Sequence, residues 1–153
     1  VVVIDGGSVA PGVVQLIEQR TNAATHQVGT LTIQGNLTIS QTGVITLHVL
    51  GGTADLQDRL VVSGALTLNG DLAINFGNGY APKRGDRLAL IQANAINGAP
   101  QNVVITGLET GFQHTLDFTG GDVTLIAQND GVPTTQAQDR SIFLPMVQRP
   151  AQW

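Results

Sequence analysis

The chain has 153 residues, of which 12% are charged, 19 are glycine and none is cysteine, and its formal net charge is −4. With only seven Lys and Arg on an acidic chain, the charge argues against a phosphate-binding surface, and we expect no nucleic-acid partner. The lack of cysteine excludes disulfides and thiol chemistry, and no apolar run reaches the roughly 18 residues that suggest a membrane-spanning helix.

Residues 1–28 are expected to form a strand and a short capping helix before a repeat region. Residues 1–4 are a continuous apolar run, which favours a strand. Residues 11–20 place their aliphatic side chains on one side, and Pro11 suits a first helical turn, so this pattern predicts an amphipathic helix. The chain begins without Met or a leader, which suggests either a mature product whose signal peptide has been removed or a trimmed chain. We expect export to an extracellular or cell-surface location.

A short phrase recurs through residues 29–128: glycine, any residue, an aliphatic, threonine or alanine, and a second aliphatic. Clear copies begin at Gly29, Gly35, Gly64, Gly70 and Gly121. Aliphatic side chains two residues apart are typical of a strand with one buried and one wetter face. The region is therefore predicted to be all-β.

A longer period is visible when the strands are aligned by their starts. Asp58, Asp86 and His114 each open a strand phrase and follow one another at intervals of 28 residues. A period near 28 is in the range of solenoid repeats, so the sequence predicts a parallel β-helix of about three to four coils. Because periodicity does not distinguish parallel from antiparallel pairing, an antiparallel β-sandwich or jelly roll is the alternative.

Residues 129–153 are expected to be a polar linker followed by an apolar strand. The strand is expected at residues 141–147, where Pro145 restricts it to a sheet edge or an intersubunit position. Since both apolar terminal segments lie outside the repeat, we expect them to form the subunit interface of a homo-oligomer. The predicted interface residues are Val1, Val2, Val3, Ile4, Ile142, Phe143, Leu144, Met146 and Val147.

Metal binding and cofactor chemistry have little support in the sequence. The three histidines, His26, His48 and His114, are far apart and have no carboxylate at a ligand-like spacing. Asp55 and Asp58, beside two glycines, are the best calcium candidates, although two carboxylates are few for Ca²⁺ and a solvated corner is the preferred interpretation. We expect no cofactor.

Catalysis is not expected either. No serine lies in a nucleophile motif. A polysaccharide-degrading enzyme would need two or three carboxylates on one face, for which Asp71, Asp86 and Asp117 are the candidates. The protein is therefore predicted not to be an enzyme.

Residues 29–100 resemble the β-strand-repeat segments of bacterial secreted surface proteins, which are similar to autotransporter passenger domains. The resemblance rests on the order of Gly51-Gly52-Thr53, Gln57-Asp58, Gly79-Tyr80-Ala81-Pro82 and Gly85-Asp86. It implies that the β-helix is right-handed. Residues 142–149 resemble the Leu-Pro-containing ends of exported proteins from green non-sulfur bacteria. Neither resemblance carries catalytic residues.

These patterns predict an extracellular structural protein whose subunits assemble head to tail into a surface filament or layer through their terminal strands. The alternative is a monomeric adhesion or carbohydrate-binding module that binds cell-surface glycans. An enzyme acting on polysaccharides is the third hypothesis.

Overall fold

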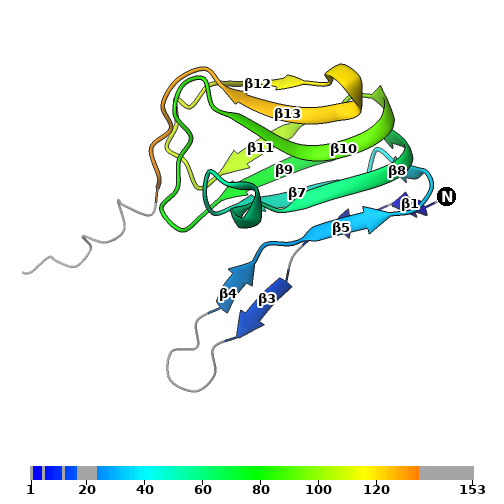
Figure 1. Cartoon of the computed structure of the whole chain (residues 1–153), viewed down its shortest axis with the longest axis horizontal. Helices are drawn as coiled ribbons and strands as arrows, with labels where there is room; N and C mark the ends of the chain where they lie inside the picture. Colours follow the sequence, from blue (N-terminus) through cyan, green and yellow to red (C-terminus); the bar gives the residue numbers. More distant parts are fainter. Residues whose placement is uncertain (1, 5, 12, 17–23, 135–153) are drawn as a thin grey trace, which may run out of the picture.

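The computed structural model describes residues 2–4, 6–11, 13–16 and 24–134 (Figure 1). Regular structure in these residues is β-strand apart from two short 3₁₀ turns. The elements are β1 (Val2–Ile4), β2 (Ser8–Val9), β3 (Val13–Leu16), β4 (Ala24–Gln27), β5 (Thr30–Ile33), β6 (Leu37–Ile39), β7 (Val44–Val49), η1 (Ala54–Leu56), β8 (Arg59–Leu68), β9 (Asp71–Phe76), β10 (Arg87–Gly98), β11 (Val103–Thr106), β12 (His114–Asp117), η2 (Thr119–Gly121) and β13 (Asp122–Ala127). No helix in these ranges is long and apolar enough to cross a membrane.

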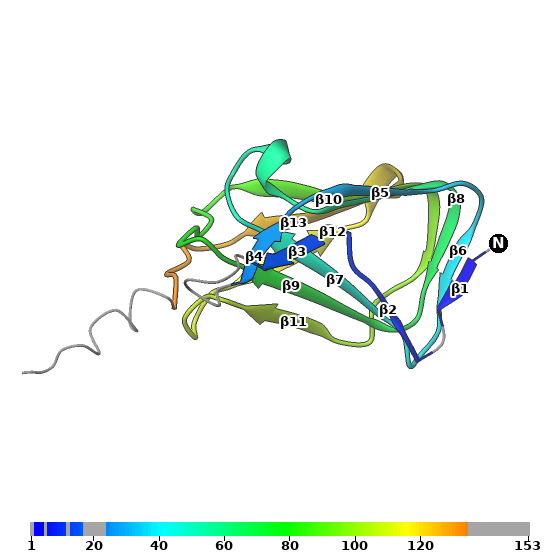
Figure 2. The ribbon, with the colours of Figure 1, turned by 90° about the horizontal axis from the view of Figure 1, so that it is seen from below.

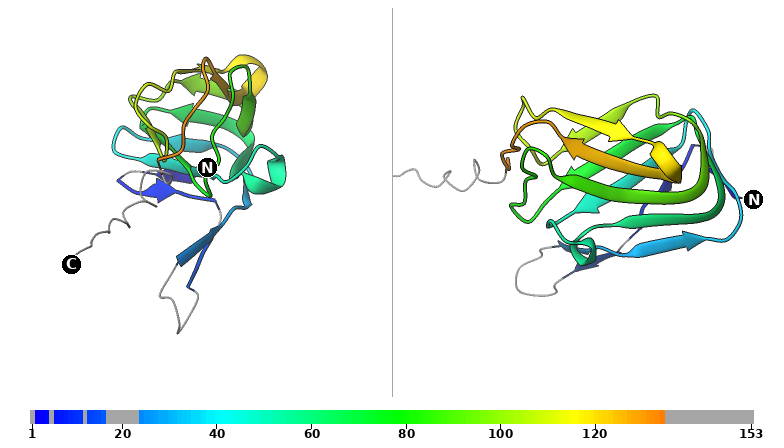
Figure 3. Two further views of the ribbon diagram at one scale, coloured as in Figure 1. Left: turned by 90° about the vertical axis from the view of Figure 1, so that its left-hand side faces the viewer. Right: turned by 45° about the horizontal axis from the view of Figure 1, so that its top comes forward.

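Two sheets enclose one core, as Figure 2 shows from below. The larger has seven strands in the order β1-β6-β8-β10-β13-β12, with β5 also paired to β8. The smaller has four strands in the order β11-β9-β7-β2. The right-hand view of Figure 3 shows β5, β8, β10, β13 and β12 following one another across the larger sheet. The expectation of a mainly β protein is confirmed.

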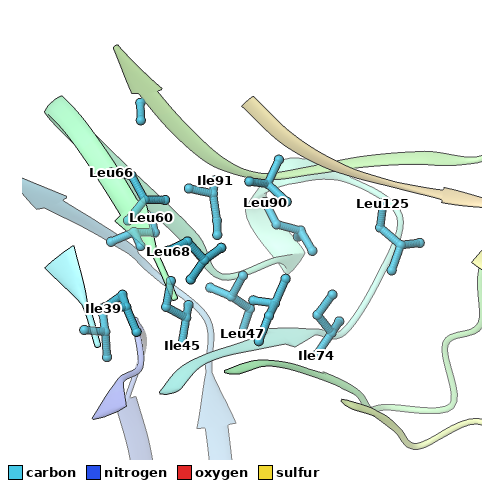
Figure 4. Packing of buried hydrophobic residues seen from close by; sticks show 14 of the residues in the cluster. Ile39, Ile45, Leu47, Leu60, Leu66, Leu68, Ile74, Leu90, Ile91 and Leu125 are labelled. Atoms are coloured by element: carbon cyan, nitrogen blue, oxygen red, sulfur yellow. The ribbon is translucent and has the colours of Figure 1, made fainter. Parts of the chain in front are cut away.

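The core is filled by aliphatic rows, because inward and outward side chains alternate along the strands. β7, β9 and β13 each alternate half-buried with buried positions. Isoleucines and leucines from both sheets meet between them (Figure 4), and the wholly buried members include Ile39, Ile45, Leu47, Leu60, Leu66, Leu68, Ile74 and Leu125.

The larger sheet bends because β8 and β10 run through a corner. β5 pairs with the first half of β8, and β6 pairs with the second half. At the bend, the N–H of Gly35 donates to Ser63 Oγ at 2.7 Å, and the N–H of Ala65 donates to Asn36 Oδ1 at 2.8 Å. A Cβ on Gly64 would overlap Asn36 Oδ1, so only glycine fits there.

Parallel pairing accounts for the periodicity of the sequence. Ile45 pairs with Leu72 and Leu60 pairs with Ile91, which are 27 and 31 positions apart. The predicted period near 28 is therefore close to the true register, although the register varies from one pair to the next.

The predicted right-handed parallel β-helix is nevertheless wrong. β13 pairs antiparallel with β10, and β12 pairs antiparallel with β13, so the larger sheet is mixed and the strands do not close into a solenoid. The chain reverses where Gly120 and Gly121 take φ values of 71° and 87°, which glycine adopts without strain. His114 consequently lies at the far edge of the sheet instead of opposite Asp86.

The arrangement fits a small β-sandwich with mixed pairing. The alternative antiparallel sandwich or jelly roll is wrong in its pairing, because β5, β6, β8 and β10 are joined by parallel ladders, as are β2, β7, β9 and β11.

The predicted N-terminal capping helix is also wrong. Residues 13–16 form β3, which pairs antiparallel with β4 in a separate two-stranded sheet. Val13 and Val14 are β-branched, and this explains why the segment prefers a strand to a helix. The hairpin extends away from the two sheets (Figure 1; Figure 3, left). β1 and β2 belong to the two sheets, so part of residues 1–28 contributes to the same core as the repeats.

Candidate interaction surface

Asp58 and Asp55, the predicted calcium ligands, lie in different environments. Asp58 is wholly buried, and its Oδ1 and Oδ2 accept the N–H groups of Gly29 and His48, each at 2.9 Å. Asp55 is exposed on η1. Among the described residues, no group of three or more histidine or acidic side chains lies close enough together to bind a metal ion. The Asp58 carboxylate therefore ties the start of β5 to β7.

A polar chain that the sequence analysis missed continues from Asp58 across the smaller sheet. His48 Nδ1 lies 3.1 Å from Asp58 Oδ2, and Asn75 Nδ2 lies 3.3 Å from His48 Nε2. Thr106 Oγ1 donates to Asn75 Oδ1 at 2.6 Å. Since an amide nitrogen only donates, His48 Nε2 accepts and Nδ1 donates to Asp58. His48, Asn75 and Thr106 are register partners, and the offsets of 27 and 31 residues were the available signal.

This chain of hydrogen bonds has a structural role. An Asp–His pair could orient a general base, but Asn75 takes the position at Nε2 where a nucleophile would have to stand. The ladder therefore holds β7, β9 and β11 in register.

The three carboxylates proposed for an enzyme have different partners. Asp71 Oδ1, on the smaller sheet, accepts from Asn102 Nδ2 at 3.0 Å, and Asp86 Oδ2 accepts the N–H of Lys83 at 2.9 Å. Asp117, on the larger sheet, pairs with Arg87 at 3.1 Å. Hydrogen bonds from Thr119, together with Arg87, lower the pKa of Asp117. The three do not form one constellation.

An aromatic cluster lies beside the turn after β9. Phe76 contacts Tyr80 and Phe112, each with ring centroids 6.2 Å apart, and Phe112 stacks on His114 at 5.9 Å. Burial lowers the pKa of His114, whereas burial and the nearby Asp86 raise the pKa of Tyr80. Tyr80, Phe112 and His114 are half-buried.

The predicted N-terminal interface residues lie partly in the sheet. β1 pairs with β6 of the same chain, with Val3 57% exposed and Ile4 packed against the core. Val1, the side chain of Val2, and Ile142, Phe143, Leu144, Met146 and Val147 lie outside the described residues. The histidine side chain at position 26 lies outside them as well.

The outer edges of β1, β2 and β5, which we call the N-terminal edge, leave the core incompletely covered. Leu31 on β5 lies in one row with Leu60 and Ile91. Leu60 and Ile91 are 0% and 1% exposed, whereas Leu31 is 38% exposed. Within the described part of the chain, β5 is paired on one side alone, to β8. An additional strand along β5 would complete this row.

The described chain ends at the opposite side of the smaller sheet. β11 and β2 are the two edge strands of that sheet. The N–H of Thr134 donates to the carbonyl of Gly107, just after β11, at 3.0 Å. Residues beyond Thr134 therefore leave from the edge farthest from β2.

Comparisons with known proteins give no functional assignment. No protein-family model matches the chain, and no curated protein is significantly similar to it.

Proposed function

We propose that the protein is a structural module of an extracellular surface, and that its copies associate through the N-terminal edge. The observation that carries the proposal is Leu31, which lies in register with the buried Leu60 but is 38% exposed because β5 ends the row. The resemblance of residues 29–100 to secreted surface proteins supports the location outside the cell.

Sheet edges explain why such a module would self-associate. An edge strand presents unpaired N–H and C=O groups that template another strand, and uncovered apolar side chains add hydrophobic stabilisation. When the two contacting surfaces of a copy differ, the contact repeats from copy to copy and gives a linear assembly. A head-to-tail filament or layer is the product of that geometry.

Two matched leucine variants test the proposal. Leu31 and Leu56 are 38% and 40% exposed, but Leu56 lies on η1 and belongs to no edge strand. In sedimentation velocity over a dilution series, we expect the wild type to associate. Leu31→Asp should weaken association at least tenfold, because it places a charge in the contact, and Leu56→Asp should not.

Two results would contradict the proposal. One is a wild type that remains monomeric at every concentration, and the other is an equal effect of the two variants. Circular dichroism of each variant checks that the fold is retained.

A second function, a monomeric glycan-binding module, is supported by the half-buried rings around Phe76. Aromatic faces and edges favour sugar contacts, and Tyr80 adds a hydroxyl. This function requires a size that does not change with concentration. It also requires saturable binding of a soluble glycan, measured by isothermal titration calorimetry, which Tyr80→Ala would weaken by removing the ring and its hydroxyl.

A further inference from the structure

We infer that residues 141–147 of a second copy add a strand to the outer edge of β5 and cover Leu31. The inference rests on the proposed function, because it names the segment through which copies associate. It commits to this chain as its own partner.

The size of the vacant edge matches the segment. β5 has four residues, Thr30–Ile33. The segment supplies four residues, Ser141, Ile142, Phe143 and Leu144, before Pro145. Proline lacks the N–H that a ladder needs, so pairing would end there.

The chemistry of the segment matches the exposed row. Residues 141–147 carry no charge, and the nearest charged residues are Arg140 and Arg149. An apolar strand flanked by charges suits an edge whose inward face presents Leu31 and the half-buried Ile33. Covering Leu31 would remove an exposed apolar side chain from water, which gives the strand a driving force.

The exit point of the chain favours a second copy. Thr134 lies at the β11 edge of the smaller sheet, and β2 is the other edge strand of that sheet. In the larger sheet, β5 lies on the side of β8 that faces away from β10, β13 and β12. In a head-to-tail stack, the N-terminal edge of the next copy faces the β11 edge of the first. The seven residues from 135 to 141 span at most about 24 Å when extended, so the segment can reach only a copy stacked within that distance of the β11 edge.

Because the chain has no cysteine, single-cysteine variants report the contact directly. Thr32→Cys places an exposed thiol on β5, and Leu144→Cys places one in the segment. Ala89→Cys is the matched control, since Ala89 is exposed on β10, separated from β5 by β8. The mixed variants are treated with a short bismaleimide, and products are separated by mass under denaturing conditions. A monofunctional maleimide verifies that the three thiols react equally.

We expect the mixture of Thr32→Cys and Leu144→Cys to give at least five times more heterodimer than the mixture of Ala89→Cys and Leu144→Cys. A double variant, Thr32→Cys with Leu144→Cys, tests the same contact within one chain. Cross-linking within that chain at high dilution would overturn the inference, because the segment would then cover its own β5.

Cross-linking no greater than the Ala89 control in either format would also overturn it. Sedimentation of the same samples tests the strand assignment and the proposed self-association separately. Association without the cross-link refutes the strand assignment alone, and absence of association refutes the proposed function as well.

Discussion

At the scale of single residues, the buried Asp58 is expected to contribute more to the free energy of unfolding than any exposed carboxylate. Its oxygens accept two backbone N–H groups and contact His48. Asp58→Asn replaces an acceptor by an NH₂ group that faces donors. We expect the free energy of unfolding in urea to fall by roughly 3 kcal/mol. Asp55→Asn, at an exposed site, should change it by less than about 0.5 kcal/mol. Equal effects would mean that the buried hydrogen bonds contribute little.

Gly70 is expected to tolerate no side chain. A Cβ there would overlap the carbonyl oxygens of Gly43 and Ser40, which are backbone atoms and cannot rotate away. We expect Gly70→Ala to lower the free energy of unfolding by at least about 2 kcal/mol. Gly7→Ala is the control, because the nearest atom to its Cβ would be 3.7 Å away, an ordinary contact. A normal stability for Gly70→Ala would show that the two turns separate easily.

His114 is expected to make stability depend on pH on the acid side of neutrality. Burial lowers its pKa below the ordinary value of 6.5, so the unfolded chain binds its proton first as the pH falls. The resulting loss of stability begins near pH 6.5 and continues through the lower pKa of the folded state. His114→Gln should therefore lose less stability between pH 7.5 and pH 5 than the wild type, measured by urea unfolding. An unchanged loss would assign the effect to other groups.

At the scale of elements, the β3–β4 hairpin is expected to be dispensable for the core. It forms its own two-stranded sheet, and an isolated hairpin in water is only marginally stable. Replacing residues 12–28 by a short Gly-Ser linker should leave the midpoint of urea unfolding within about 0.3 M of the wild-type value. This limit assumes that the free energy of unfolding falls with urea concentration at the rate usual for a small protein. A large drop would show that the hairpin supports the N-terminal edge.

The positions of the strands could be predicted where apolar and polar residues alternate regularly. The direction in which the strands pair could not. The phrases at Gly64 and Gly70 became the second half of β8 and β9, because aliphatic residues two apart require a buried face. Asn-Gly is a recognisable turn signal, and Asn78 and Gly79 have positive φ values of 57° and 72°. The antiparallel return of β13 and β12 depends on long-range contacts that local periodicity does not encode.

The helix predicted for residues 11–20 shows a related limit. An aliphatic cluster can follow a helical or a strand period over so few residues, and cross-strand pairing decided in favour of the strand at Val13–Leu16.

At the scale of the whole molecule, removal of the C-terminal segment is expected to separate the copies without unfolding them. A chain that ends at Arg140 keeps every described strand of both sheets. We expect it to remain folded by circular dichroism and to sediment as a monomer, because it lacks the strand that we propose to cover β5. Continued polymerisation of the truncated chain would place the contact elsewhere.

The proposed interaction surface could be inferred from the sequence only in part, for a physical reason. Composition identified apolar segments at residues 1–4 and 141–147. The exposure of Leu31 was not visible in the sequence, because its phrase at Gly29 is indistinguishable from copies that lie in the interior. A residue becomes an edge residue through what lies beside it in space. The link of His48 to Asn75 and Thr106 was missed likewise, since it requires the register.

The placement of the two edges also determines how the module would respond to tension. A load applied between β2 and the exit after Thr134 runs across the smaller sheet, from one edge strand to the other. Hydrogen bonds in a sheet lie across the strands, so this load pulls along the hydrogen bonds and opens the ladders one strand at a time. The bonds of a ladder then do not resist the load together, as they would if the strands were pulled lengthwise past one another. A chain of such modules would therefore yield gradually, as a compliant tether between the bodies it joins.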